Sequence, residues 1–115
     1  MVDARDVAAV AARVLAGEPA GQARDVTGPE ALSHAEAAAR LAASLGRPVR
    51  YVPVDDTAAR SGLLAAGMGE WLADGLVELY RDYRRPGGYA ARVHDTVRDL
   101  TGAEPRTLDQ ALADP

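Results

Sequence analysis

The chain has 115 residues and a net charge of −4, and its length fits one domain spanning residues 1–115. Its apolar residues are mostly small, with 25 Ala, 12 Leu, 11 Val and neither Ile nor Phe, so we expect a folded domain with a thin core. The absence of cysteine excludes disulfides, thiol nucleophiles and cysteine zinc sites, and the absence of lysine excludes Schiff-base chemistry.

The first third of the chain predicts two helices. Apolar residues recur at helical spacing within residues 7–15, and Asp3 stands where an N-cap is needed. Ser33 and Glu36 have the spacing of a capping box, which predicts that a second helix begins there and runs to residue 45.

Two short segments predict β-strands, at residues 24–28 and 48–54. The second segment is rich in β-branched residues and alternates, with Val49 and Tyr51 on one face and Arg50, Val52 and Val54 on the other. Pro53 places this strand at a sheet edge or at its end. Because two short strands do not form a stable sheet by themselves, we expect either that further strands come from elsewhere or that the domain is mainly helical with a small ribbon.

The second half of the chain predicts mainly helices. A helix weakened by glycine follows residue 55, and a strongly amphipathic one covers residues 70–85. A turn or loop is predicted at residues 86–88. Asp95 is a candidate cap for a short helix, and a capping box at residues 107–110 opens a terminal turn.

Several stretches carry a family resemblance, in the order VDARDVA (2–8), VTGPEALS (26–33), LGRPVRY (45–51), and then LTG (100–102) with PRT (105–107). In this order and spacing the chain resembles the C-terminal portion of the NmrA-like family of atypical short-chain dehydrogenase/reductases. The resemblance implies a helix-rich α/β fold, the C-terminal lobe of a Rossmann-type protein with about two short strands and four to six helices.

The resemblance stops short of the nucleotide site. In such proteins a glycine-rich turn between a strand and a helix binds the pyrophosphate. The densest glycines here, Gly62, Gly67 and Gly69, lie in or beside a helix and follow no predicted strand. The chain therefore resembles a substrate-binding lobe without the dinucleotide half, which would precede Met1, and we expect no cofactor on this chain alone.

The aromatic residues point to a substrate site. Four of the five lie within a stretch of 19 residues, where helices of the resembled family help to wall the substrate cavity. Aromatic sides with hydroxyl tips suit a mostly apolar small molecule. The predicted substrate-binding residues are Trp71, Leu72, Leu76, Tyr80, Tyr83 and Tyr89. The alternative is that these side chains fill the core or an oligomer interface.

Catalytic candidates are few. His34 and His94 are the groups that titrate near neutral pH, and Tyr80 offers a hydroxyl as an acid. Asp95 is a candidate for orienting His94, although ordinary surface histidines are the simpler interpretation. We read the pair Asp55 and Asp56 as helix caps rather than a metal site, and expect no metal.

Arg84 and Arg85 have two interpretations. They are either a clamp for an anionic ligand or, more simply, solvated residues at the end of a helix, where positive charge is favourable.

The leading hypothesis is a stand-alone small-molecule-binding domain that resembles the NmrA-like substrate lobe. The alternatives are a cofactor-independent isomerase, cyclase or dehydratase, and a subunit of a split oxidoreductase whose partner binds the nucleotide. We expect a homodimer or such a partner subunit, because the surface that packs on a nucleotide domain would otherwise be exposed.

A pI near 5.1 argues against nucleic acid as a binding partner. With no apolar span and no leader, the protein is predicted to be cytoplasmic, and its composition suggests a GC-rich bacterial source.

Overall fold

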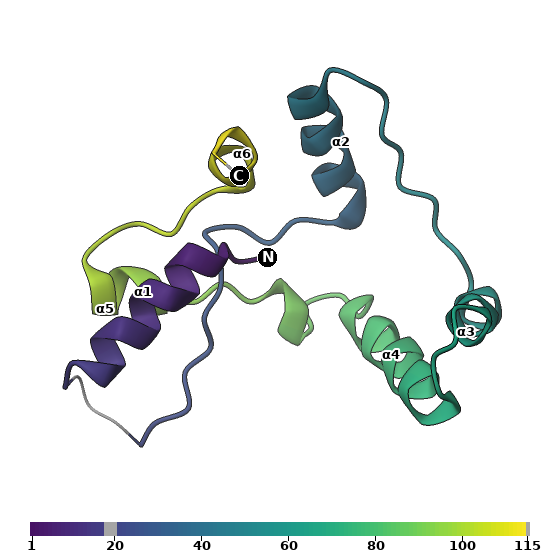
Figure 1. Ribbon diagram of the computed structural model, residues 1–115, viewed down its shortest axis with the longest axis horizontal. Helices are drawn as coiled ribbons and strands as arrows, with labels where there is room; N and C mark the ends of the chain where they lie inside the picture. The colour runs from purple at the N-terminus through teal and green to yellow at the C-terminus, as the bar shows by residue number, and fades with distance from the viewer. Residues whose placement is uncertain (18–20, 115) are drawn as a thin grey trace. The chain divides into compact units, whose positions relative to one another are not determined.

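A computed structural model describes residues 1–17 and 21–114. These residues form helices joined by irregular connections (Figure 1). The helices are α1 (Ala4–Leu15), α2 (His34–Leu45), α3 (Asp56–Ala65), α4 (Glu70–Tyr83), the short 3₁₀ helix η1 (Tyr89–Ala91), α5 (Thr96–Thr101) and α6 (Leu108–Ala113). The helices predicted from the sequence are confirmed, and η1 follows the predicted turn.

The chain groups into two compact units. The first unit comprises Met1–Tyr51 and Val93–Pro115, and the second comprises Val52–Arg92. In the first unit α1 packs against α5 and α2 packs against α6. In the second unit α4 packs against both α3 and η1. A single domain over residues 1–115 stays a prediction.

The helix caps follow the local sequence closely. The carboxylate of Asp3 accepts a hydrogen bond from the backbone N–H of Arg5 at 2.8 Å, at the start of α1. Ser33 and Thr107 each form a full capping box, which opens α2 and α6. Asp95 stands at the N-cap position of α5, as predicted, but its side chain makes no capping hydrogen bond and pairs with Arg98 at 2.9 Å instead.

Neither predicted strand forms within the described part of the chain. Residues 24–28 and 48–54 run as connections without helix or strand. A strand requires a neighbour that completes its ladder, and the described residues supply none to residues 48–54. In the first segment the Gly28 N–H instead donates to the Met1 carbonyl at 2.8 Å. An added Cβ at Gly28 would lie 2.3 Å from that carbonyl oxygen, so the close approach requires glycine.

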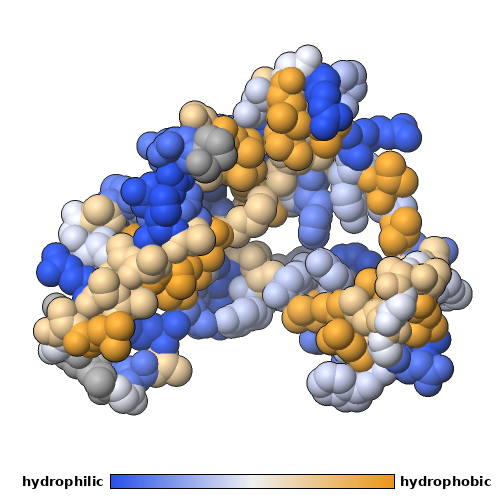
Figure 2. Space-filling view, in the orientation of Figure 1, coloured by the Kyte–Doolittle hydropathy of each residue, from blue (hydrophilic) through white to orange (hydrophobic). Residues whose placement is uncertain are grey.

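The core is thin, as the composition predicts. Among the described residues, the buried hydrophobic side chains are Val10, Ala73 and Val97. Val10 belongs to α1 and Val97 to α5, the two helices that pack together in the first unit. Apolar side chains remain visible on the surface (Figure 2). Specific polar contacts therefore carry more of the stability than in a domain with a larger core.

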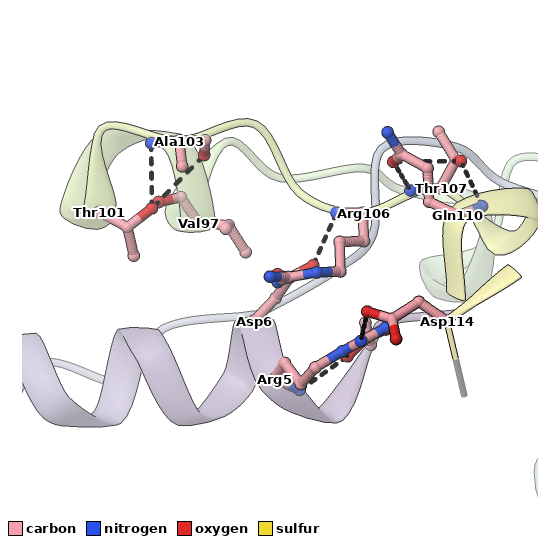
Figure 3. Close-up of polar contacts among 10 residues, drawn as sticks. Arg5, Asp6, Val97, Thr101, Ala103, Arg106, Thr107, Gln110 and Asp114 are labelled. Carbon is pink, nitrogen blue, oxygen red and sulfur yellow. Dashed lines mark hydrogen bonds and ion pairs between the residues drawn. The ribbon is translucent and has the colours of Figure 1, made fainter. Parts of the chain in front are cut away.

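The buried carboxylate of Asp6, near the start of the chain, binds Arg106, near its end. Asp6 is 3% exposed, although it stands in the first turn of α1. One of its oxygens accepts the Arg106 backbone N–H at 2.7 Å, and the other accepts the Arg106 guanidinium (Figure 3). This pairing satisfies a group that would be costly to bury alone.

Arg5 makes a second link between the ends of the first unit. Its guanidinium binds both Asp3 oxygens, at 2.8 and 3.0 Å, and also the Asp114 carboxylate at 2.8 Å (Figure 3). The side-chain hydrogen bond from Arg5 and then its backbone N–H lower the pKa of Asp3 from 3.8 to about 2.

This pKa shift predicts a pH dependence. Because the folded pKa is below the unfolded value, the contribution of Asp3 to stability is complete above about pH 4 and is lost as the pH falls towards 2. In Arg5→Gln the pKa of Asp3 is expected to rise towards 3.8, measured by NMR titration of its carboxyl carbon. Arg13→Gln is the control and leaves that pKa unchanged. An unchanged pKa in Arg5→Gln would contradict the assignment.

No helix in the described part of the chain is long and apolar enough to span a membrane.

Candidate functional site

The predicted substrate residues all belong to the second unit, and most of them lie on one side of α4. Leu72, Leu76, Leu79 and Tyr83 follow each other at helical spacing, with Tyr80 beside them. The rings of Tyr80 and Tyr83 meet edge to face, with centroids 5.9 Å apart. We call these five residues the tyrosine face.

The tyrosine face lies partly beside the buried side of α4. Ala73 is fully buried and precedes Tyr80 by seven residues, so the two lie on nearly the same side of the helix, while Asp74 forms an ion pair with Arg60 of α3. Nine residues separate Asp74 from Tyr83, which places them about 180° apart on a helix. Tyr80 and Tyr83 are 48% and 44% exposed, so both rings are accessible within this unit.

Arginine–carboxylate pairs hold α4 in place against α3. Asp56, in the first turn of α3, accepts hydrogen bonds from Arg84 and from Arg81, the latter at 2.9 and 3.0 Å. The guanidinium of Arg84, and then that of Arg81, lower the pKa of Asp56. Asp55, its neighbour, caps α3 by accepting the Ala58 N–H at 2.8 Å. The cap interpretation therefore holds for Asp55, whereas Asp56 binds two arginines.

The two arginines proposed as an anion clamp are already engaged. Arg84 binds Asp56, and Arg85 pairs with Asp82 at 3.1 Å. Because carboxylates of the chain accept from both guanidinium groups, this geometry favours a structural role over a ligand clamp.

Trp71 and Tyr89 stand apart from the tyrosine face. Trp71 is nine residues from Tyr80, which places the two about 180° apart around α4. It is 87% exposed, and it belongs to another side of the helix. Tyr89 lies in η1, which packs against α4, and is 62% exposed. Of the predicted substrate residues, Leu72, Leu76, Tyr80 and Tyr83 therefore share one face of α4. Tyr89 lies on the neighbouring helix η1, and Trp71 lies on another side of α4.

The catalytic candidates are divided between the units. His34 is the first residue of α2, and its ring stacks on Tyr51 with the centroids 5.3 Å apart. His94 also belongs to the first unit, whereas Tyr80 belongs to the second. The two histidines contact different partners, and their catalytic roles stay predictions.

In the fold, His94 contacts Thr27 and Asp25 rather than the side chain of its neighbour Asp95. The Thr27 hydroxyl accepts from the His94 backbone N–H at 2.9 Å, and the Asp25 carboxylate is 3.8 Å from His94 Nε2. The hydroxyl of Thr96 donates to the Asp25 carbonyl at 2.7 Å. Sequence analysis missed this cluster, because 67 residues separate Thr27 from His94 and no local spacing signals the contact.

The expectation that this chain alone holds no dinucleotide stays a prediction. A pyrophosphate binds the free N–H groups at the start of a helix that follows a strand. In α1 and α3 these groups are bound by the carboxylates of Asp3 and Asp55, and in α2 by the Ser33 hydroxyl. The carboxylates of Asp3 and Asp55 thus place negative charge at the starts of α1 and α3, whereas α4 begins after Gly69 with no side-chain cap.

Comparison with known proteins gives clear relatives, although no protein-family model matches the chain. It is 49% identical to an NAD(P)H azoreductase of Xenophilus azovorans over 109 residues, which are 93% of this chain and 37% of the relative. It is 37% identical to the oxidoreductase YesF of Bacillus subtilis, covering 97% of this chain and 39% of the relative. A (4-alkanoyl-5-oxo-2,5-dihydrofuran-3-yl)methyl phosphate reductase of Streptomyces griseus is 40% identical, over 91% of this chain and 36% of its own length.

These homologues are oxidoreductases. A solved structure agrees with them: the NADPH-dependent quinone oxidoreductase of Escherichia coli matches with a TM-score of 0.71 and 27% identity. The match covers 94% of this chain and 39% of that one. The predicted helix-rich fold class of such a reductase is thereby confirmed. The chain spans only 36–39% of the length of all these relatives.

Proposed function

We propose that this chain is the substrate-binding part of an NmrA-like NAD(P)H-dependent oxidoreductase, and that the tyrosine face of α4 binds the electron acceptor. The observation that carries the proposal is the 49% identity to an NAD(P)H azoreductase over nearly the whole chain but little more than a third of the relative. In this proposal the dinucleotide binds to the remainder of such a protein, because the described residues contain no strand that leads into a glycine-rich helix start.

The chemistry of the tyrosine face suits a planar, conjugated acceptor. The names of the relatives specify azo compounds, a quinone and an oxo-dihydrofuran, all of which contain conjugated double bonds. Tyr80 and Tyr83 offer exposed ring surface for stacking, with hydroxyl groups for an acceptor carbonyl or azo nitrogen. Leu72, Leu76 and Leu79 supply the apolar floor along the helix.

Replacing both Tyr80 and Tyr83 with leucine is expected to weaken binding of menadione and of methyl red about thirtyfold, because each of the two lost aromatic contacts is worth roughly 1 kcal/mol. Binding is measured by isothermal titration calorimetry on the purified chain. The thermal midpoint is expected to change little, since both rings are accessible.

Tyr51→Leu is the matched control, since Tyr51 is 45% exposed and lies in the first unit. It is expected to bind both compounds like the unmodified chain. Equal affinity of the double variant and the unmodified chain would reject the tyrosine face as the acceptor site. Tight, stoichiometric binding of NADPH by the isolated chain would contradict the placement of the nucleotide elsewhere.

A further inference from the structure

A different side of α4 carries an exposed tryptophan next to a hollow. Trp71 is 87% exposed, and Gly75 follows it one turn later. A Cβ added at Gly75 would meet no atom within 4 Å. Glu78 stands at the end of this row, at i+7 from Trp71. A groove of about 400 Å³ lies along it, lined by Trp71, Leu72, Asp74, Gly75 and Glu78.

The groups along this groove match the chemistry of a guanidinium. An indole face attracts cations, and arginine stacks on it more readily than lysine does. A carboxylate completes the recognition by accepting two parallel hydrogen bonds. The Glu78 carboxylate has no ion-pair partner among residues 1–17 and 21–114, whereas Asp74 is bound by Arg60. Helical side chains lean towards the N-terminus, which brings Glu78 over the open position at Gly75.

The chain itself supplies suitable arginines. All 13 of its basic residues are Arg. Arg47, Arg50 and Arg92 are exposed and have no ion pair with any residue that the structure describes. In a two-fold dimer each such contact forms twice, which doubles its contribution. We propose that Trp71, Gly75 and Glu78 bind an arginine side chain of a second copy of this chain. This Trp71–Glu78 surface adjoins the tyrosine face at Leu72 but includes neither Tyr80 nor Tyr83, and the inference does not depend on the proposed acceptor.

The first test blocks the groove without harming the helix. Gly75→Leu fills the hollow and removes a helix-weakening glycine, so the variant is expected to fold at least as stably as the unmodified chain. Sedimentation velocity is expected to show self-association of the unmodified chain with a dissociation constant on the order of 100 μM, and a loss of at least tenfold in Gly75→Leu. Gly62→Leu in α3 is the matched control and is expected to associate normally, because a Cβ there also meets nothing.

The second test uses Trp71 as its own reporter, since it is the single tryptophan of the chain. N-acetyl-L-arginine amide is expected to change its emission in a saturable way and to dissociate the dimer. N-acetyl-L-lysine amide is expected to act at least tenfold more weakly, because its ammonium stacks less well. In Glu78→Gln the response to the arginine amide is expected to fall at least tenfold.

Three results would overturn the proposal. The first is a chain that stays monomeric throughout the concentration range. The second is a Gly75→Leu variant that associates as the unmodified chain does. The third is a Trp71 emission that responds equally to the arginine and lysine amides.

Discussion

Replacing Arg106 with methionine is expected to lower the free energy of unfolding by about 3 kcal/mol, a large effect for a residue near the end of the chain. The reason is the position of its partner. Asp6 is 3% exposed and receives both the guanidinium and the backbone N–H of Arg106. Methionine keeps much of the side-chain volume but leaves a buried carboxylate with one of its two partners.

The measurement is urea unfolding followed by far-UV circular dichroism. Arg98→Met is the matched control, because Arg98 pairs only with the exposed carboxylates of Asp95 and Asp99, at 2.9 and 3.9 Å. Surface pairs of this kind are worth roughly 0–1 kcal/mol. If both variants lost the same stability, the buried pair would have no special role in the first unit.

Val97→Ala is expected to cost about 2 kcal/mol, through the cavity that it leaves between α1 and α5. Val97 is 2% exposed and is one of the few buried hydrophobic residues in the described chain, so few neighbours are present to refill the space. The helix that carries it, α5, has six residues and depends on this packing rather than on its own propensity.

Thermal and urea unfolding both measure this loss. Val93→Ala removes the same atoms at a position that is 46% exposed in the same unit, and is expected to change stability by less than about 0.5 kcal/mol. Equal destabilisation by the two variants would show that the α1–α5 contact is not a core contact.

The sequence determines the helices and most of their ends, because the forces involved act within one or two turns. Capping boxes at Ser33 and Thr107, the cap at Asp3 and the left-handed glycine that ends α2 at Gly46 all depend on neighbours in the chain. Residue spacing likewise places Leu72, Leu76, Tyr80 and Tyr83 on one side of α4.

Side chains with a choice of partners were harder to predict. Glu36 and Arg40 have the i,i+4 spacing of an ion pair, yet Glu36 binds the Ser33 backbone N–H at 2.7 Å in its capping box. Arg40 binds Glu30 instead, with its second contact at 2.6 Å, and reaches Asp109 of α6 at 3.4 Å. Asp95, the candidate for orienting His94, pairs with Arg98, and the Asp25 carboxylate lies 3.8 Å from His94 Nε2 instead. Arg40 and His94 thus contact partners that folding brings near, whereas Glu36 keeps its local capping partner.

For this protein, local order along the chain thus defines α1 to α6 and the composition of the tyrosine face, since periodicity and caps need only adjacent residues. Tertiary structure alone decided that Asp6 is buried against Arg106, 100 residues away, that Thr27 binds His94, and that residues 24–28 and 48–54 form no strand. The physical reason is that burial, ion pairing and strand ladders each depend on two surfaces in contact. The residue pattern of a segment describes one of these surfaces and does not specify the other.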